Sequence, residues 1–242
     1  MSDPDHIIVG SGINALVCAA MLAGKGQKVL VLERNDRIGG CIRTDEITAP
    51  GFVHDVMATT FVLFITSPAY AALASDLGRH GLEFCNTDMP TGVLRPDGSH
   101  LVQRMDRAAN VAALNAASPG DGDAYATDVG GIEKDAGLLF GLLGGGLWSY
   151  KTLKLIAGEA WRRGPRGLAA FFGEAMLPSR GWLETSYKSD LTRALWAPWS
   201  LHAGIGPEDA FSGQIAKVIA FALEAAGAPI VKGGAGKLLD AF

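Results

Sequence analysis

A glycine-rich turn near the N-terminus constrains the fold of this chain more than any other feature of its sequence. Residues 7–9 are a short apolar run, as expected for a central parallel strand that is buried on both faces. The following turn has Gly10 for a tight bend, Gly12 where a backbone approaches a pyrophosphate, and Ala15 where a helix packs closely on a strand. Amides at the start of that helix would face the phosphates. The spacing predicts a strand, a phosphate-binding turn and a helix.

The next segment completes this unit. Residues 15–23 are rich in Ala and Leu and end at Gly24, which predicts a helix, and residues 28–32 predict a second strand. Glu33 follows that strand, 21 residues after Gly12. A carboxylate at this distance accepts hydrogen bonds from ribose hydroxyls. The strand, turn, helix and acid together predict a dinucleotide site.

A second pair of glycines bears on which dinucleotide is bound. An NAD-binding domain normally continues into another helix and strand, whereas this chain has Gly39 and Gly40 within a loop. Adjacent glycines leave backbone open to a phosphate or to the edge of a flavin ring, and Arg37 or Arg43 would supply positive charge.

These residues resemble the phytoene-desaturase-like flavoproteins, within the class that includes amine oxidases. The resemblance is closest to the subgroup of pyridine nucleotide-disulfide oxidoreductase domain-containing protein 2, with the motifs G-x-G-x-N-x-L, E-R-x-x-x-x-G-G and G-F-x-x-D. The matching residues are Gly10, Gly12, Asn14, Leu16, Glu33, Arg34, Gly39, Gly40, Gly51, Phe52 and Asp55. Amine oxidases usually have Arg after the glycine pair, where this chain has Cys41, which favours the desaturase-like branch.

The resemblance implies FAD, bound extended with its adenosine at Glu33 and its isoalloxazine beyond the glycine pair. The residues expected to bind it are Gly10, Ser11, Gly12, Asn14, Ala15, Glu33, Arg34, Gly39, Gly40, Cys41 and Arg43. Cys41 is interpreted as a small residue beside the flavin rather than a redox thiol, because no second cysteine is close in sequence.

Catalytic residues are not identified. The five histidines are scattered without ligand spacing, so no metal site is predicted. His54 and Asp55 follow the glycine pair, and a structural hydrogen bond is the expected role there. His202 is a weak candidate for an acid or base on the substrate side. In flavoenzymes of this type the cofactor carries the chemistry, since N5 accepts a hydride.

The remaining chain follows the same family more faintly. Residues 91–102 predict a β-hairpin around a Pro-Asp-Gly turn, residues 118–123 a loop leading into a helix, and residues 227–237 a Pro-x-x-Gly-Gly element before a helix. The expected fold class is α/β: a Rossmann-like, glutathione-reductase-type FAD-binding βαβ sheet with an inserted, mainly helical substrate domain. The expected parts are residues 1–90 for FAD, 91–215 for substrate or a lid, and 216–242 as a return segment.

Family members are considerably longer and close the flavin site with later strands and a Gly-Asp segment. The chain therefore matches only their first half and is incomplete relative to the family. Three interpretations remain open: a split enzyme whose second half is another polypeptide, a truncated piece, or a self-contained remnant. An isolated half-sheet would expose strand edges and apolar faces, which favours the split, heterodimeric enzyme.

The middle of the chain is very apolar. Residues 136–149 have about 14 positions without charge, fewer than the ~20 that a membrane span needs, so a helical hairpin around residues 144–146, or a lid that dips into a membrane surface, is favoured. The apolar side chains of this region line a core, a channel for an apolar substrate, or the face that meets the missing half. Residues 162–166 (RRGPR) are basic and are interpreted as a solvated loop, with anionic lipid headgroups as the alternative partner.

Charge and cysteine content narrow the function classes. The net charge is −4, so no basic field attracts nucleic acid. Charged residues make up only 19% of the chain, which favours partner contacts or an apolar cavity. The first strand begins almost at once, with no signal peptide, so a cytoplasmic location is expected, with peripheral membrane contact as an alternative. Three cysteines without C-x-x-C spacing predict no disulfide framework, and Cys18 is expected in the core.

The leading hypothesis is an FAD-dependent oxidoreductase of the dehydrogenase or desaturase type, or its FAD-binding N-terminal subunit. It would oxidise a mostly apolar organic substrate by hydride transfer to flavin N5, with oxygen, a quinone or another protein as electron acceptor. The alternative is a non-catalytic carrier or escort protein on the same fold for a lipophilic ligand. An NAD(P)-dependent dehydrogenase is a third hypothesis, although no nicotinamide site is evident in the sequence.

Overall fold

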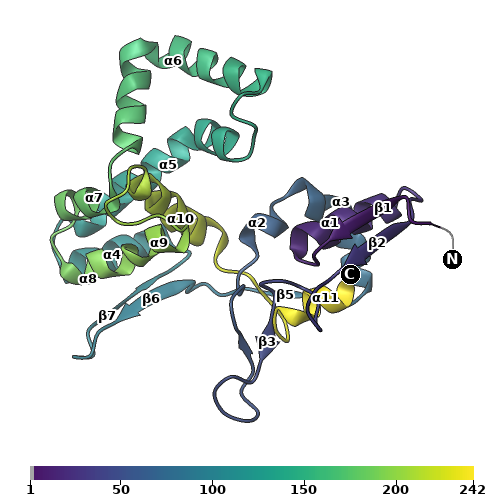
Figure 1. The fold of residues 1–242 in the computed structure, drawn as a ribbon. Helices are drawn as coiled ribbons and strands as arrows, with labels where there is room; N and C mark the ends of the chain where they lie inside the picture. Colours follow the sequence, from purple (N-terminus) through teal and green to yellow (C-terminus); the bar gives the residue numbers. More distant parts are fainter. Residues whose placement is uncertain (1–2) are drawn as a thin grey trace. The chain divides into compact units, whose positions relative to one another are not determined.

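A computed structural model describes residues 3–242 of the chain, which form two compact units (Figure 1). The first unit contains residues 3–87 and 228–242, and the second contains residues 88–227. The boundary expected at residue 216 falls inside a helix, α10 (Ser212–Ala226), that belongs to the second unit. Ala216 and Ala220 of this helix lie in the core of that unit, which holds the helix there.

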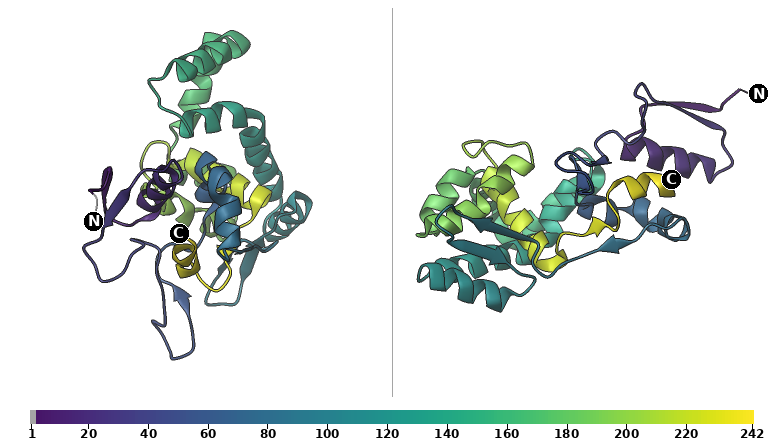
Figure 2. Two further views of the ribbon diagram at one scale, coloured as in Figure 1. Left: turned by 90° about the vertical axis from the view of Figure 1, so that its right-hand side faces the viewer. Right: turned by 90° about the horizontal axis from the view of Figure 1, so that it is seen from below.

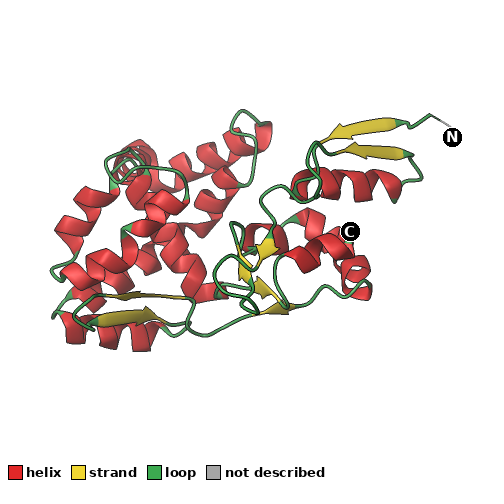
Figure 3. Ribbon diagram, turned by 60° about the horizontal axis from the view of Figure 1, so that its bottom comes forward, coloured by secondary structure: helices red, strands yellow, loops and turns green. Residues whose placement is uncertain are grey.

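The first unit begins with the predicted strand, turn, helix and strand. They are β1 (His6–Val9), α1 (Ile13–Ala23) and β2 (Val29–Leu32). The two strands pair in parallel, and α1 lies on one face of the pair (Figure 3). The order of these elements confirms the pattern expected from the glycine turn, and the helix begins two residues earlier than expected.

Burial of these strands differs from expectation. Ile7 is 60% exposed and Val9 is 84% exposed, so the prediction of a strand buried on both faces is wrong for this chain. Ile7 pairs with Leu30 and Val9 with Leu32, and alternate residues of a strand share a face. An apolar patch therefore lies on one face of the pair.

The expectation of a buried Cys18 is also wrong, because its side chain is exposed on α1. No residue of α1 is fully buried, since only two strands lie beneath this helix. Cys41 and Cys85 are exposed as well.

The rest of the first unit surrounds its own core. Its elements are β3 (Thr44–Asp45), β4 (His54–Asp55), α2 (Val62–Ile65), α3 (Pro68–Arg79), β5 (Phe84–Cys85), β8 (Ile230–Val231) and α11 (Gly236–Ala241). β3 pairs with β4, and β5 pairs with β8, so the C-terminal segment returns to this unit through a strand pair. Leu238 and Ala241 of α11 are buried in a core with Ile42, Leu77 and Val231.

The second unit is mainly helical. It contains the expected hairpin of β6 (Thr91–Leu94) and β7 (His100–Gln103), followed by α4 (Arg107–Ala117), α5 (Asp121–Leu143), α6 (Tyr150–Ala175), α7 (Ser179–Ser186), α8 (Asp190–Trp196), α9 (Pro198–His202) and α10. α5 and α6 form the helical hairpin that the sequence predicts around residues 144–146. α5 packs on α4 and α10, and part of α6 projects away from the other helices of this unit (Figure 2). Within residues 3–242, no helix combines the length and apolar character of a membrane span.

The core of the second unit contains aromatic side chains around a buried carboxylate. Tyr125 stacks on Trp196 with ring centroids 5.5 Å apart. The Tyr125 hydroxyl donates a hydrogen bond of 2.5 Å to Glu224, which also accepts one from Asn110 and pairs with Arg107 at 2.7 Å. Burial, followed by the hydrogen bond to Glu224, raises the pKa of Tyr125. The network satisfies a carboxylate that would otherwise be costly to bury.

The basic segment at residues 162–166 is not a solvated loop, which corrects the sequence interpretation. Helix α6 bends at Gly164, where φ is +72°, and Pro165 follows. Arg162 pairs with Glu159 at 2.5 Å, while Arg163 pairs with Glu159 at 2.6 Å and with Asp135 of α5. The ion pair with Asp135 therefore joins α6 to α5 just before the bend, and the pair with Glu159 lies within α6.

Candidate functional site

The glycine turn leaves the start of α1 ready for an anion. Gly10 has φ of +92°, a conformation that a side chain would strain, so glycine is needed there. Gly12 is the N-cap of α1, and no side chain of the described residues caps the helix. Asn14 and Ala15 lie in the first turn, which contains no acidic residue. The amides of this turn carry the positive end of the helix dipole, as a phosphate requires.

Ser11 joins three segments of the site. Its amide and hydroxyl donate hydrogen bonds to Glu33 Oε2, at 3.1 and 2.5 Å. The amide of Gly39 donates to the backbone oxygen of Ser11 at 3.0 Å and to its hydroxyl oxygen at 3.1 Å. Ser11 is 1% exposed. The turn, the end of β2 and the second glycine pair are therefore fixed to one another by a single buried residue.

The carboxylate of Glu33 is already surrounded by donors. Oε2 accepts from the amide and hydroxyl of Ser11, and Oε1 accepts from the backbone and side-chain nitrogens of Asn35, at 2.9 Å each. The hydrogen bond from the Ser11 hydroxyl, followed by that from the Asn35 amide, lowers the pKa of Glu33 to about 2. A carboxylate has roughly four acceptor positions. Ribose hydroxyls at Glu33 must therefore displace one of these donors.

The second glycine pair packs tightly. Gly39 has φ of +113°, and a Cβ atom there would lie 2.5 Å from Leu239 and 2.9 Å from the Ile42 oxygen. A Cβ atom on Gly40, which has φ of +60°, would lie 3.3 Å from the Cα atom of Gly12. Because Gly39 and Gly40 have no side chains, this loop can pack against both the first glycine turn and α11.

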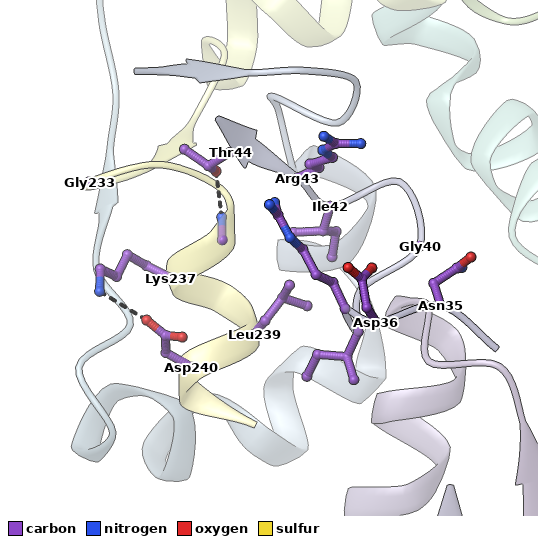
Figure 4. A pocket seen from close by; sticks show the side chains of 13 residues that line it. Asn35, Asp36, Gly40, Ile42, Arg43, Thr44, Gly233, Lys237, Leu239 and Asp240 are labelled. Atoms are coloured by element: carbon purple, nitrogen blue, oxygen red, sulfur yellow. Dashed lines mark hydrogen bonds and ion pairs between the residues drawn. The ribbon is translucent and has the colours of Figure 1, made fainter. Parts of the chain in front are cut away.

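A cavity of about 870 Å³ lies beside the second glycine pair (Figure 4). Its volume falls within the range of small-molecule sites. One wall comes from residues 35–44 and the other from the segment 233–240. Of the predicted cofactor residues, Gly40 and Arg43 line this cavity. Thr44, Lys237 and Asp240 also line it, and the sequence analysis did not identify them as site residues.

The first wall carries two arginines, Arg37 and Arg43, together with Asp36. Arg37 pairs with Asp45 at 2.7 Å, and Arg43 pairs with the same carboxylate. The Arg37 and Arg43 guanidinium groups hold the pKa of Asp45 below its usual value, and Asp45 raises the pKa of Arg37. Asp36 and Asp45 balance the two arginines in number, so the wall offers guanidinium donors to a ligand phosphate without a net positive charge. On the other wall, Lys237 pairs with Asp240 at 2.9 Å.

Thr44 and Asp55 form hydrogen bonds to the C-terminal segment that makes the second wall of the cavity. The Thr44 hydroxyl donates to Asp55 at 2.7 Å and accepts from the Gly236 amide at 2.8 Å. Asp55 also accepts from the Ala235 amide at 2.7 Å. A Cβ atom on Gly234 would lie 2.5 Å from Thr44 Cγ2, so the contact requires glycine. The aspartate of the G-F-x-x-D motif therefore binds the amide of Ala235, the N-cap residue of α11.

The other predicted residues lie outside the cavity. Arg34 and Cys41 are exposed and do not line it. His54 contacts Thr48 at 2.8 Å, which confirms a structural hydrogen bond for this histidine. His202 lies on α9, where its ring meets Trp199 edge-on at 5.3 Å. No cluster of potential metal ligands is present in the described part of the chain.

Parts of the chain are similar in sequence to known proteins. Residues 8–77 match the NAD(P)-binding Rossmann-like domain. A limonene dehydrogenase subunit of Castellaniella defragrans is 31% identical over 121 residues, which cover 50% of this chain and 21% of that protein. All-trans-retinol 13,14-reductase of Danio rerio is 52% identical over 54 residues, which cover 22% of this chain and 9% of that protein.

A solved structure of a putrescine oxidase triple mutant is similar over nearly all of this chain at low sequence identity. Its TM-score is 0.53 at 18% identity, and the match covers 98% of this chain and 48% of that chain. The chain thus spans about half the length of this structural neighbour. The fold is the α/β Rossmann-like FAD-binding fold that the sequence predicts.

Proposed function

Since the chain is related to oxidoreductases of the amine oxidase and phytoene desaturase-like superfamily, we propose that it is the FAD-binding N-terminal part of an FAD-dependent dehydrogenase or desaturase. Its substrate is a mostly apolar organic molecule. The two relatives named for limonene and retinol support an apolar substrate, because both names denote largely hydrocarbon compounds. The specific subgroup expected from the motifs is part of this proposal.

The observation that carries the proposal is the position of Ser11. It joins the start of α1, the carboxylate of Glu33 and the amide of Gly39 through hydrogen bonds of 2.5 to 3.1 Å. A dinucleotide needs a phosphate site, a ribose acceptor and a second backbone surface close together. The hydrogen bonds of Ser11 bring these three elements together.

The residues present fit the adenosine diphosphate half of FAD. Space above Gly12 is open, since a Cβ atom there meets no other atom within 4 Å, and the first amides of α1 lack a side-chain cap within residues 3–242. These amides bind the pyrophosphate, and Arg43 adds charge from the cavity wall. Glu33 accepts the ribose hydroxyls once Asn35 or Ser11 releases an acceptor position. When bound, FAD supplies a hydride acceptor at N5.

A second polypeptide completing the flavin domain is part of the proposal. The exposed face of β1 and β2 supports it, because parallel sheets are normally covered on both faces. The name of the limonene dehydrogenase relative, which denotes one subunit of an enzyme, supports it as well. The cytoplasmic location expected from the sequence remains a prediction.

Titration calorimetry with ADP, FAD, FMN and NAD⁺ tests the cofactor assignment on this chain. We expect ADP and FAD to bind, and FMN, which lacks adenosine, to bind at least 10-fold more weakly. The Gly12→Val variant should lose ADP and FAD binding, because its side chain fills the open space above the turn. Gly78→Val is the matched control, since a Cβ atom on this α3 residue also meets nothing within 4 Å.

Absence of ADP and FAD binding by the wild-type chain would contradict the proposal. NAD⁺ binding as tightly as FAD would instead favour an NAD-dependent dehydrogenase. The carrier hypothesis predicts that a lipophilic ligand binds while ADP and FAD do not.

A further inference from the structure

An exposed apolar stripe runs along the first half of α6, in the second unit. Tyr150, Leu153, Ala157 and Trp161 are spaced three or four residues apart, so they share one face of the helix. Tyr150 is 82% exposed and Trp161 is 93% exposed. Trp148, in the loop just before the helix, is 95% exposed. Single exposed apolar residues are common, but a contiguous apolar patch on one helix face marks an interaction surface.

The opposite face of the same helix is the one that packs on α5. Thr152 is buried, and Leu155 lies so close to Gly141 that a Cβ atom there would be 2.6 Å from Leu155 Cδ2. Glu159 and Arg163 continue this inner face, where Arg163 pairs with α5. Packing within the hairpin therefore accounts for the inner face and leaves the stripe uncovered.

A basic row follows the stripe. Lys151, Lys154 and Arg162 each come one residue after a stripe residue, so they flank the stripe about 100° further around the helix and are exposed. Lys151 and Lys154 also border the groove between α5 and α6. Arg162 pairs with Glu159, whereas neither lysine has an ion pair within residues 3–242. An exposed aromatic stripe next to unpaired lysines is typical of a helix that lies in a membrane interface.

We propose that this face of α6, with Trp148, docks on the surface of an anionic phospholipid bilayer. The aromatic rings enter the boundary between headgroups and acyl chains, while Lys151 and Lys154 bind anionic headgroups. The helix lies parallel to the surface and does not cross the bilayer, which agrees with the absence of a membrane-spanning helix among the described residues. The docking requires no flavin, so it stands or fails independently of the proposed function.

Cosedimentation of the full chain with vesicles tests the proposal. We expect binding to vesicles of phosphatidylcholine mixed with phosphatidylserine, and much weaker binding to phosphatidylcholine alone. Combined Trp148→Ser and Trp161→Ser should reduce the partition coefficient by at least ~10-fold. Lys151→Gln and Lys154→Gln should each reduce it by about 5-fold, and added salt should weaken binding of the wild-type chain.

Matched controls lie elsewhere in the same unit. Leu94→Ser removes an apolar side chain that is 74% exposed on β6, and Lys134→Gln removes an exposed lysine of α5. Neither should change binding. Circular dichroism spectra should show that the variants keep their helices, since all the substituted side chains are exposed.

A spectroscopic readout locates the contact. Brominated lipids should quench tryptophan emission of the wild-type chain, and combined Trp148→Phe and Trp161→Phe should bind while losing that quenching. Equal binding to neutral and anionic vesicles, no binding, or unchanged binding by the serine variants would each overturn the proposal. A wild-type dimer that the serine variants dissociate, with no vesicle binding, would assign the stripe to a second copy instead.

Discussion

The hydroxyl of Ser11 donates a hydrogen bond of 2.5 Å to the carboxylate of Glu33, across 22 residues of sequence. The bond joins the glycine turn to the end of β2, and it uses an acceptor position that a ribose hydroxyl would also need. Adenosine binding at this carboxylate is therefore an exchange of donors. The same bond makes the stability of the ligand-free chain depend on pH through Glu33.

Acid should lower the free energy of unfolding of the wild-type chain through protonation of Glu33. Its pKa is lowered from 4.5 to about 2, chiefly by Ser11, so the folded chain binds this proton less readily than the unfolded chain. The contribution to the free energy of unfolding is present above pH 4.5, declines as pH falls, and is lost below about 2. Thermal unfolding of wild type and Glu33→Gln between these values should show their difference shrinking with acid. A constant difference throughout this range would contradict the assignment.

Gly39→Ala should disrupt the packing of the second glycine pair beside the cavity. A Cβ atom would lie 2.5 Å from Leu239 and 2.9 Å from the Ile42 oxygen, and φ of +113° is unfavourable for alanine. We expect a loss of about 2 kcal/mol or more in the free energy of unfolding, measured with urea.

Gly78→Ala is the control for that experiment. Gly78 lies within α3, and a Cβ atom there meets nothing within 4 Å. We expect a gain of up to ~1 kcal/mol, because alanine favours helix more than glycine does. Similar effects of the two substitutions would show that the packing around Gly39 is not as described.

Thr44→Ala should loosen the C-terminal wall of the cavity. The hydroxyl accepts from the Gly236 amide and donates to Asp55, so its loss leaves a helix-terminal amide without this partner. We expect about 1 kcal/mol of destabilisation in urea. Thr48→Ala is matched to it, because Thr48 makes an exposed hydrogen bond to His54 and should cost less than ~0.5 kcal/mol.

Local sequence features predicted the local elements of the site. The glycine spacing and the apolar run of residues 7–9 identified β1, the turn and α1, since tight turns and helix starts depend on neighbouring residues. Burial depends on what packs from elsewhere, so the same features misplaced Cys18 in the core. Likewise, nothing local distinguishes Thr44 as the partner of Gly236, which lies 192 residues away. The donors that occupy Glu33 were missed for a related reason, because Ser11 reaches it only after β1 and β2 pair.

Tyr125→Phe should destabilise the second unit by removing one donor from a buried carboxylate. Glu224 is 7% exposed and keeps Arg107 and Asn110, but it loses the hydrogen bond of 2.5 Å from the tyrosine hydroxyl. The stacking on Trp196 is retained by phenylalanine, so the change isolates the hydroxyl. We expect a loss of about 1 to 3 kcal/mol in urea unfolding followed by tryptophan fluorescence. Tyr150 is 82% exposed, so Tyr150→Phe should change stability by less than ~0.5 kcal/mol. Equal effects of the two substitutions would contradict the buried network.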